Sequence, residues 1–248
     1  MLRAVLWDID GTLAETECDG HRVAFNRAFE RTGVPWRWDE RYYGELLRIA
    51  GGRERLLHDM ESCDRAPHAP EARVALAAAQ HALKNDYYVR IVKEGRLSLR
   101  AGVLELLNDC TRAGVLLGIA TTTSRCNVEA LLAQELGQDW SARFATVVCA
   151  EDAPRKKPDP QAYEKALEAL ALPPSEVIAI EDSPAGATAA QRAGLAVVVT
   201  SSYYFPACNV DVLARGPSLG TTEGWSPPAD RSVDRIDLGQ LMRWQAAP

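Results

Sequence analysis

Asp8 and Asp10 are separated by one residue, stand directly after the apolar run AVLW and are followed at once by a glycine and a threonine. Carboxylates this close repel one another, so the pKa of each is raised unless a cation or hydrogen-bond donors hold both ionised. A hard divalent cation with oxygen ligands meets that demand. The alternative is a turn or a helix N-cap, because Asp-x-Asp-Gly is a common turn sequence. The pair alone leaves both interpretations open.

Three further stretches carry groups that could act with this pair. Glu181 and Asp182 follow an apolar run and could complete a metal site. The run TTTS begins with Thr121 and Thr122 and leads into a helical pattern, so its hydroxyl and N–H groups meet at a helix N-terminus, where anions bind. Lys157, in the stretch RKKPDP, could be held inward by the turn prolines. Each signal is weak alone, but together they predict a nucleophile, a cation, hydroxyls and a lysine around one phosphate-sized space.

Short apolar runs separated by helical patterns predict the fold that brings these motifs together. The expected strands are Leu2–Trp7, Val115–Thr121, Ala145–Cys149, Val177–Ile180 and Ala196–Thr200. This alternation predicts an α/β fold: a Rossmann-like parallel sheet with helices on both faces. Ligands bind beyond the carboxyl ends of the strands in such sheets, and the motifs stand at those ends.

The stretch from residue 16 to residue 96 has a different pattern, with helical spacing and no convincing strand. We expect an inserted all-helical domain here, broken into helices by the stretch PHAP at 67–70. The predicted domains are therefore a core domain of residues 1–15 and 97–248 and a helical cap domain of residues 16–96. Beyond them, Arg215–Arg231 is expected to be a surface loop before a last helix at Leu238–Trp244.

Composition limits the class of protein and its partners. A chain of 248 residues with 47% hydrophobic residues can bury a large core. Its 28 Lys and Arg against 34 Asp and Glu, a net charge of −6, argue against nucleic acid as a partner. The 6 scattered cysteines form no C-x-x-C pair and indicate reduced thiols. No signal peptide or long apolar run is evident, so we expect a cytoplasmic protein without a membrane partner.

The order of the motifs resembles that of the haloacid dehalogenase-like superfamily. The pattern D-x-D-G-T starts at Asp8, the threonine motif at Thr121 follows, and the K-P and E-D motifs complete the order. The resemblance implies that Asp8 is the nucleophile and that Asp10 is the general acid and base. It also implies that Thr121 binds the transferring phosphoryl group, while Lys157 neutralises charge between Asp8 and the phosphoryl oxygens.

The same resemblance implies a Mg²⁺ cofactor. Asp8, Asp182 and the backbone carbonyl of Asp10 would hold the ion, and Glu181 would assist directly or through water. The second aspartate argues against the dehalogenase branch, because cleavage of a carbon–halogen bond leaves no oxygen to protonate. The implied reaction is hydrolysis of a phosphate monoester through an aspartyl-phosphate, which replaces one hard displacement by two easier ones.

The helical insertion resembles the C1 cap of the β-phosphoglucomutase-like group, which closes over the active site. Within that group the resemblance is to the CbbY-like sugar bisphosphate phosphatases, through the stretches GTLAETECDGHRVAFNRAF, WDERYYGELLRIAGGRERL and LKNDYY. Members of that family act on xylulose-1,5-bisphosphate, a misfire product that inhibits Rubisco. The resemblance therefore implies a small sugar phosphate substrate, with xylulose-1,5-bisphosphate first among candidates, a link to the Calvin cycle and an enzyme that can work as a monomer.

Substrate-binding residues carried over by position are Glu17, His21, Arg22, Tyr43, Gly51, Gly52, Arg53 and Lys84 from the cap, with Thr122 from the core. Arg53 is the candidate for the second phosphate, because a guanidinium group matches phosphate oxygens in bidentate fashion. Most of the other residues in this set have an alternative interpretation without substrate contact. His21 could be a packed core histidine, Arg22 and Lys84 could be solvated helix charges, and Gly51 and Gly52 could form a plain turn. Tyr42 could take the place of Tyr43.

Two other functions compete with the phosphatase. A β-phosphoglucomutase would protect the aspartyl-phosphate from water and return the phosphoryl group to the sugar, and its cap also carries a basic residue near Arg53. The set of Glu17, His21 and the Gly51-Gly52 pair favours the phosphatase. A non-catalytic binding protein would keep the fold, but every residue of the catalytic motifs is present.

Overall fold

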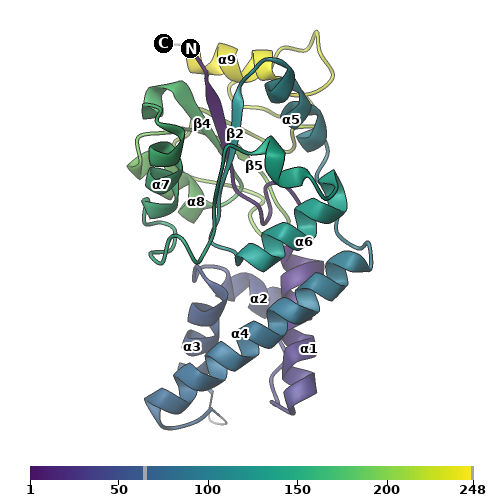
Figure 1. The fold of residues 1–248 in the computed structure, drawn as a ribbon, viewed down its shortest axis with the longest axis vertical. Coiled ribbons are helices and arrows are strands. Elements are labelled where there is room, and N and C mark those ends of the chain that lie inside the picture. The colour runs from purple at the N-terminus through teal and green to yellow at the C-terminus, as the bar shows by residue number, and fades with distance from the viewer. Residues whose placement is uncertain (64–65, 247–248) are drawn as a thin grey trace.

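The computed structural model describes residues 1–63 and 66–246 (Figure 1). It contains one parallel sheet with the strand order β3-β2-β1-β4-β5-β6. The strands are β1 (Ala4–Trp7), β2 (Leu116–Ala120), β3 (Thr146–Val148), β4 (Val177–Glu181), β5 (Ala196–Thr200) and β6 (Ala214–Gly216). The α/β class and the five expected strands are confirmed, and β1 lies between β2 and β4 at the centre of the sheet.

Helices cover both faces of the sheet because successive strand residues point to opposite sides. Val5 and Trp7 belong to a core cluster with α5 (Val103–Arg112), α6 (Arg125–Leu136) and α9 (Leu238–Ala246). Ala4 and Leu6 face the other cluster, with α7 (Gln161–Leu170) and α8 (Pro184–Arg192). Short 3₁₀ helices lie at Trp140–Arg143 and Pro174–Glu176. The central strand is therefore buried on both faces, as its unbroken apolar sequence predicts.

The expectation of a surface loop over Arg215–Arg231 is wrong in part. The segment begins inside β6, and Trp225 is buried with its ring centroid 4.9 Å from that of Trp244. Gly216 permits this packing, since a Cβ there would lie 2.2 Å from the Trp225 ring. A three-residue strand gives no periodic signal, and an isolated tryptophan among turn residues does not show which surface it covers.

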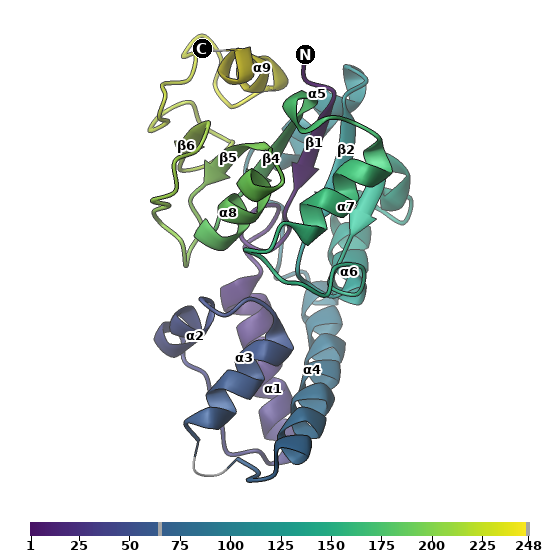
Figure 2. The same ribbon diagram turned by 90° about the vertical axis from the view of Figure 1, so that its left-hand side faces the viewer.

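The cap lies at one end of the sheet and consists of helices only within its described residues (Figure 2). It contains a π-helical turn (Glu17–His21), α1 (Arg22–Thr32), α2 (Glu40–Leu46), α3 (Gly52–Glu61) and α4 (Pro70–Lys93). Its own core is rich in aromatic rings, among them Phe25, Phe29 and Trp38. The break predicted before Pro70 is confirmed, because α4 starts at that residue. The exact domain boundaries stay predictions.

None of the helices in the described part of the chain combines the length and the apolar character needed to cross a bilayer.

Candidate active site

A sharp turn after β1 places the aspartate pair at the carboxyl edge of the sheet. The N–H of Gly11 donates to the carbonyl of Ala14 at 2.8 Å, and Gly11 has a φ of +86°. A Cβ at this position would lie 2.1 Å from Oδ2 of Asp182, so the turn excludes any side chain there. The glycine of the motif thus allows the Asp8 turn and the Asp182 carboxylate to approach closely.

Asp8 is buried and forms an ion pair with the buried Lys157. Nζ of Lys157 donates at 2.6 Å to Oδ1 of Asp8 and at 2.6 Å to Oε1 of Glu181, which also accepts from the hydroxyl of Tyr163 at 2.6 Å. Burial raises the pKa of Asp8 to about 8; the charge of Lys157 opposes this rise, and that of Glu181 adds to it. Burial also acts on Lys157, but the carboxylates of Asp8 and Glu181 raise its pKa above the usual range.

Asp182 completes a cluster of three carboxylates at the end of β4. One oxygen from each of Asp8, Glu181 and Asp182 lies within 4.8 Å of the others. Burial and the repulsion from Glu181 and Asp8 raise the pKa of Asp182 well above its usual range. Lys157 supplies one positive charge for three carboxylates, and all the donor atoms are hard oxygens. These residues therefore fit a divalent cation such as Mg²⁺.

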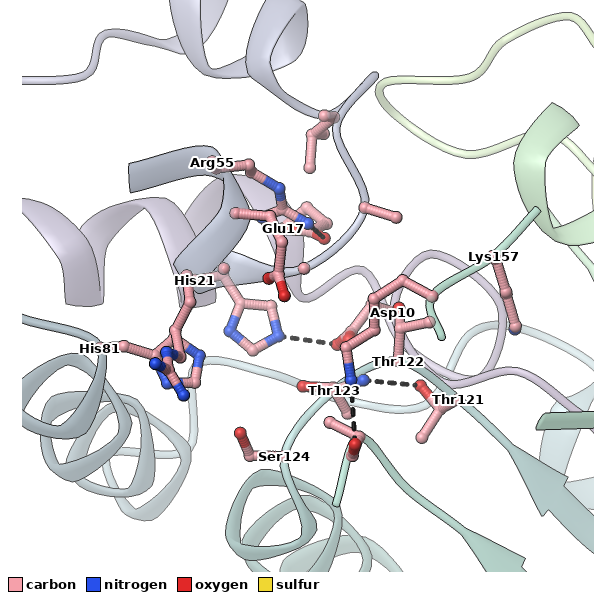
Figure 3. A pocket seen from close by; sticks show the side chains of 18 of the residues that line it. Asp10, Glu17, His21, Arg55, His81, Thr121, Thr122, Thr123, Ser124 and Lys157 are labelled. Atoms are coloured by element: carbon pink, nitrogen blue, oxygen red, sulfur yellow. Dashed lines mark hydrogen bonds and ion pairs between the residues drawn. The ribbon is translucent and has the colours of Figure 1, made fainter. Parts of the chain in front are cut away.

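Asp10 has different partners from Asp8, all of which come from the start of the cap. Its Oδ1 accepts from the hydroxyl of Thr16 at 2.5 Å. The same oxygen lies 2.8 Å from Nε2 of His21 (Figure 3). Burial opposes ionisation of Asp10, but the charge and hydrogen bond of His21, together with the Thr16 hydroxyl, lower its pKa below the usual range. The His21 ring stacks on Tyr88 with centroids 4.2 Å apart. The Asp10–His21 hydrogen bond can hold a proton beside the nucleophile.

Hydroxyl and amide groups at the end of β2 face the same space. Thr121 is buried, and its Oγ1 accepts from the backbone N–H of Thr123 at 3.3 Å. Ser124 precedes α6 as its N-cap residue, and the backbone N–H of Arg125 in the first helical turn donates to the carboxylate of Glu151 at 3.0 Å. The hydroxyls predicted from the TTTS run are present at a helix N-terminus, and the anion that this terminus binds in the structure is the Glu151 carboxylate.

A cavity of about 740 Å³ lies between this edge of the sheet and the cap. The predicted site residues that line it are Asp8, Asp10, Glu17, His21, Gly51, Gly52, Arg53, Lys84, Thr121, Thr122, Lys157 and Asp182. The fold thus brings together four motifs that are up to 174 residues apart in the sequence, since it joins Asp8 to Asp182 in one cavity.

Three predicted residues do not line the cavity. Glu181 is fully buried and bonded to Lys157, and its direct contact with a metal ion stays a prediction. The Arg22 guanidinium donates to the carbonyl of Cys18 at 3.1 Å and pairs with Glu40 at 3.4 Å. Tyr43 is buried and donates from its hydroxyl to Oε2 of Glu17 at 2.5 Å, so it supports the cavity wall through Glu17. Direct substrate contacts of Arg22 and Tyr43 stay predictions.

The cavity is also lined by side chains that the sequence did not single out, among them the Arg55 cation and the His81 imidazole. Arg55 donates from Nη1 to the hydroxyl of Tyr43 at 3.0 Å, and its Nη2 lies 3.6 Å from Oε1 of Glu17. His81 lines the same wall; burial, with repulsion from Lys84, lowers its pKa to about 3. His81 lies three residues before Lys84 on α4, the spacing that puts two side chains on one helix face, and this signal could have identified it. No such spacing in the sequence favours Arg55 over Arg53 as a cavity residue.

The model of the haloacid dehalogenase-like hydrolase family matches residues 2–194. The chain belongs to this family. It is 42% identical over 207 residues to the plasmid-encoded protein CbbY of Cupriavidus necator, a match that covers 82% of this chain and 80% of the relative. The protein CbbY of Rhodobacter capsulatus is 41% identical over 203 residues, covering 82% of this chain and 87% of the relative.

A solved structure of CbbY from Rhodobacter sphaeroides has a similar fold. That structure is of a point mutant in complex with xylulose-1,5-bisphosphate, and it superposes with a TM-score of 0.79 at 36% identity, covering 90% of this chain and 99% of the other. The resemblance to CbbY-like proteins and the helical cap on a Rossmann-like core are thereby confirmed. The enzyme class predicted from the motifs, a phosphoric monoester hydrolase of this superfamily, is confirmed as well.

Proposed function

We propose that this enzyme is a Mg²⁺-dependent phosphatase of a small sugar bisphosphate, with xylulose-1,5-bisphosphate as its first candidate substrate. The observation that carries the proposal is the distribution of charge along one cavity. Asp8, Lys157 and Asp182 stand at its sheet end, and the arginine and lysine side chains of the cap line the other side. With Mg²⁺ on the sheet-end carboxylates, a substrate with a phosphate at each end matches both groups of charges. The CbbY structure that contains xylulose-1,5-bisphosphate supports the same substrate class.

The chemistry follows from the residues at the sheet end. A carboxylate oxygen of Asp8 attacks phosphorus, and the bond from phosphorus to the sugar oxygen breaks. Lys157, 2.6 Å from Asp8, offsets the charge of the phosphoryl oxygens, while Thr121 donates to one of them. Mg²⁺, held by Asp8 and Asp182, would neutralise further charge there. Asp10 passes to the leaving oxygen the proton that is held in its hydrogen bond with His21, and it later takes one from the water that hydrolyses the aspartyl-phosphate.

The cap side of the cavity is suited to the remainder of the substrate. Glu17 is held by Tyr43 and Arg55, so its carboxylate can accept from sugar hydroxyls in a fixed direction. Lys84 is buried beside the rings of Phe25 and Tyr88, at 5.4 and 5.3 Å from their centroids, and burial lowers its pKa to about 8. Its Nζ donates to Oδ1 of Asn85 at 3.3 Å, and a phosphate or sugar oxygen in the cavity would give this ammonium group a further, charged or polar partner.

The deciding experiment is phosphate release with Mg²⁺ and after its removal by a chelator. The panel contains xylulose-1,5-bisphosphate, ribulose-1,5-bisphosphate, fructose-1,6-bisphosphate, phosphoglycolate and β-glucose-1-phosphate, with isomer formation followed in parallel. We expect kcat/KM for xylulose-1,5-bisphosphate to exceed the others by at least about tenfold, and the chelator to abolish release. Equal, weak phosphate release from all five compounds would reject xylulose-1,5-bisphosphate as the substrate but keep the phosphatase reaction. Formation of glucose-6-phosphate without released phosphate would indicate a mutase.

Arg53→Ala is expected to raise KM for a bisphosphate about tenfold to a hundredfold, because hydrogen bonds between charged groups contribute about 1.5 to 3 kcal/mol each. For a monophosphate sugar of the same length, KM should change less than about threefold. Arg41→Ala is the matched control, since Arg41 lies on the exposed surface of α2 with its side chain 92% exposed. Equal effects of Arg53→Ala on both substrates would remove Arg53 from the distal phosphate site.

A further inference from the structure

The segment Ser201–Pro206 leaves the end of β5 and reaches the cap beside α2 (Figure 2). We call it the clasp loop. Two adjacent tyrosines carry its contacts. The hydroxyl of Tyr203 donates to Oε2 of Glu40 at 2.9 Å, across 163 residues of sequence. The ring of Tyr204 meets that of Tyr43 edge-on, with centroids 5.8 Å apart and an interplanar angle of 64°. The clasp loop is thus a core segment that is attached to the cap.

The contact between Tyr204 and α2 is close. A Cβ built on Gly44 would lie 2.9 Å from Cδ1 of Tyr204, so the ring lies directly against the backbone of α2. Phe205 also packs against the aromatic cluster of the cap, and it lines the active-site cavity. Through Tyr43, the Tyr204 ring touches the residue that holds the Glu17 carboxylate. Displacement of the clasp loop would therefore alter the sugar side of the cavity.

The other end of the clasp loop is bonded to the carboxylate cluster. The buried Ser202 donates from Oγ to Oδ2 of Asp182 at 2.6 Å. The same Oγ accepts from the N–H of Phe205 at 3.3 Å, and the N–H of Ser202 donates to the carbonyl of Phe205 at 3.1 Å. These bonds fix the turn that carries Tyr203 and Tyr204. One short segment with its own internal hydrogen bonds thus links the orientation of the Asp182 carboxylate to the positions of the Tyr203 and Tyr204 rings.

A second connection between core and cap lies on α4 and α6. Asn85 donates from Nδ2 to Oγ of Ser124 at 3.2 Å and accepts from Nδ2 of Asn127 at 3.1 Å. This link involves no member of the carboxylate cluster. The clasp loop differs from the Asn85 connection in this respect, because a change in the position of the Asp182 carboxylate is transmitted to the cap through the hydrogen bond of Ser202.

We infer that the clasp loop couples the cation site to closure of the cap, with Ser202 positioning Asp182 and Tyr204 positioning Tyr43 and Glu17. A cation that fixes the Asp182 carboxylate also fixes the acceptor of the Ser202 hydrogen bond, and the loop is then held in the conformation that packs Tyr204 on α2. The inference rests on the proposed function for the divalent cation and, in the kinetic measurements, for the sugar substrate; the exchange measurement uses Mg²⁺ and no substrate.

The test is hydrogen exchange of the α2 amides, Glu40–Leu46, in the full chain with and without Mg²⁺. We expect Mg²⁺ to slow this exchange at least about threefold in the wild type. Ser202→Ala should remove the Mg²⁺ effect. Ser201→Ala is the matched control: it deletes the hydrogen bond to the Pro206 carbonyl and leaves the Asp182 contact, so the effect should remain. Tyr204→Ala should speed the exchange of α2 both with and without Mg²⁺.

Kinetic measurements separate positioning from loss of structure. Tyr204→Ala should raise KM for a sugar phosphate about threefold to tenfold, while kcat/KM for p-nitrophenyl phosphate, which needs no sugar contact, changes less than about twofold. Tyr204→Phe should restore wild-type behaviour, because the Tyr204 hydroxyl has no hydrogen-bond partner among the described residues. Equal Mg²⁺ protection of α2 in the wild type and Ser202→Ala, or no protection in the wild type, would overturn the coupling.

Discussion

Asp8→Asn is expected to lower kcat for every phosphate ester by at least about ten-thousandfold and to leave the fold intact. An amide cannot form the aspartyl-phosphate, and no other carboxylate can replace it. Glu181 is engaged by Lys157 and Tyr163 at 2.6 Å each, and Asp182 by Ser202 at 2.6 Å. The loss should be the same for good and poor leaving groups, because the step that fails is the attack on phosphorus.

The effect of this change on stability has a defined sign. Burial raises the pKa of Asp8 to about 8 in the folded chain, from 3.8 for an ordinary aspartate. When the pKa of a group is higher in the folded than in the unfolded chain, its contribution to stability is fully present at a pH below the unfolded-state pKa. That contribution is lost as the pH rises through the folded-state pKa. Without a divalent cation, wild-type stability should therefore fall between about pH 4 and pH 8 through this group. The asparagine side chain does not titrate, so Asp8→Asn should be as stable as the wild type, or more stable, at pH 8.

The measurement combines phosphate release with thermal unfolding of the same preparations, with the metal removed by a chelator for the unfolding series. Asp86→Asn is the matched control, because Asp86 lies on an exposed position of α4. Retained turnover in Asp8→Asn would exclude the aspartyl-phosphate. A large loss of thermal stability would instead show that the Asp8 carboxylate supports the fold and would leave the kinetic result without a clear cause.

The core of the site was predictable because its geometry follows from topology. Residues that end parallel strands meet at one edge of the sheet whatever their distance in sequence, so Asp8, Thr121 and Asp182 could be placed together from apolar runs alone. The turn at Gly11 was predictable for a similar reason, since the motif requires a backbone that few other residues adopt. The helical nature of the insertion followed from its periodicity.

The cap side could not be predicted in the same way, because contacts between helices depend on tertiary packing. The sequence did not decide between Tyr42 and Tyr43; in the folded chain Tyr43 bonds to Glu17, whereas Tyr42 bonds to Asp59. Arg55 reaches Glu17 only because tertiary packing brings the first turn of α3 against Phe25 of α1, and the clasp loop meets α2 across more than 160 residues. No local pattern encodes such pairs.

Asp10→Asn should separate the two halves of the reaction, because Asp10 acts on protons and not on phosphorus. It lies outside the Asp8–Lys157 ion pair and bonds to Thr16 and His21. An amide keeps this shape but can neither donate a proton to a sugar oxygen nor accept one from water. We expect kcat for sugar phosphates to fall about a hundredfold to ten-thousandfold, with the dissociation constant of the sugar phosphate changed less than about threefold.

The leaving group decides how this loss appears. The p-nitrophenolate group departs without a proton, so Asp10→Asn should still form the aspartyl-phosphate from p-nitrophenyl phosphate. The later attack of water still lacks its general base, so p-nitrophenolate should appear as a burst of about one equivalent followed by slow turnover. Asp8→Asn should give no burst, which makes it the control. Slow, linear release of p-nitrophenolate by Asp10→Asn would mean that Asp10 is needed to form the aspartyl-phosphate even when the leaving group takes no proton. The role of Asp10 would then be to position the phosphoryl group.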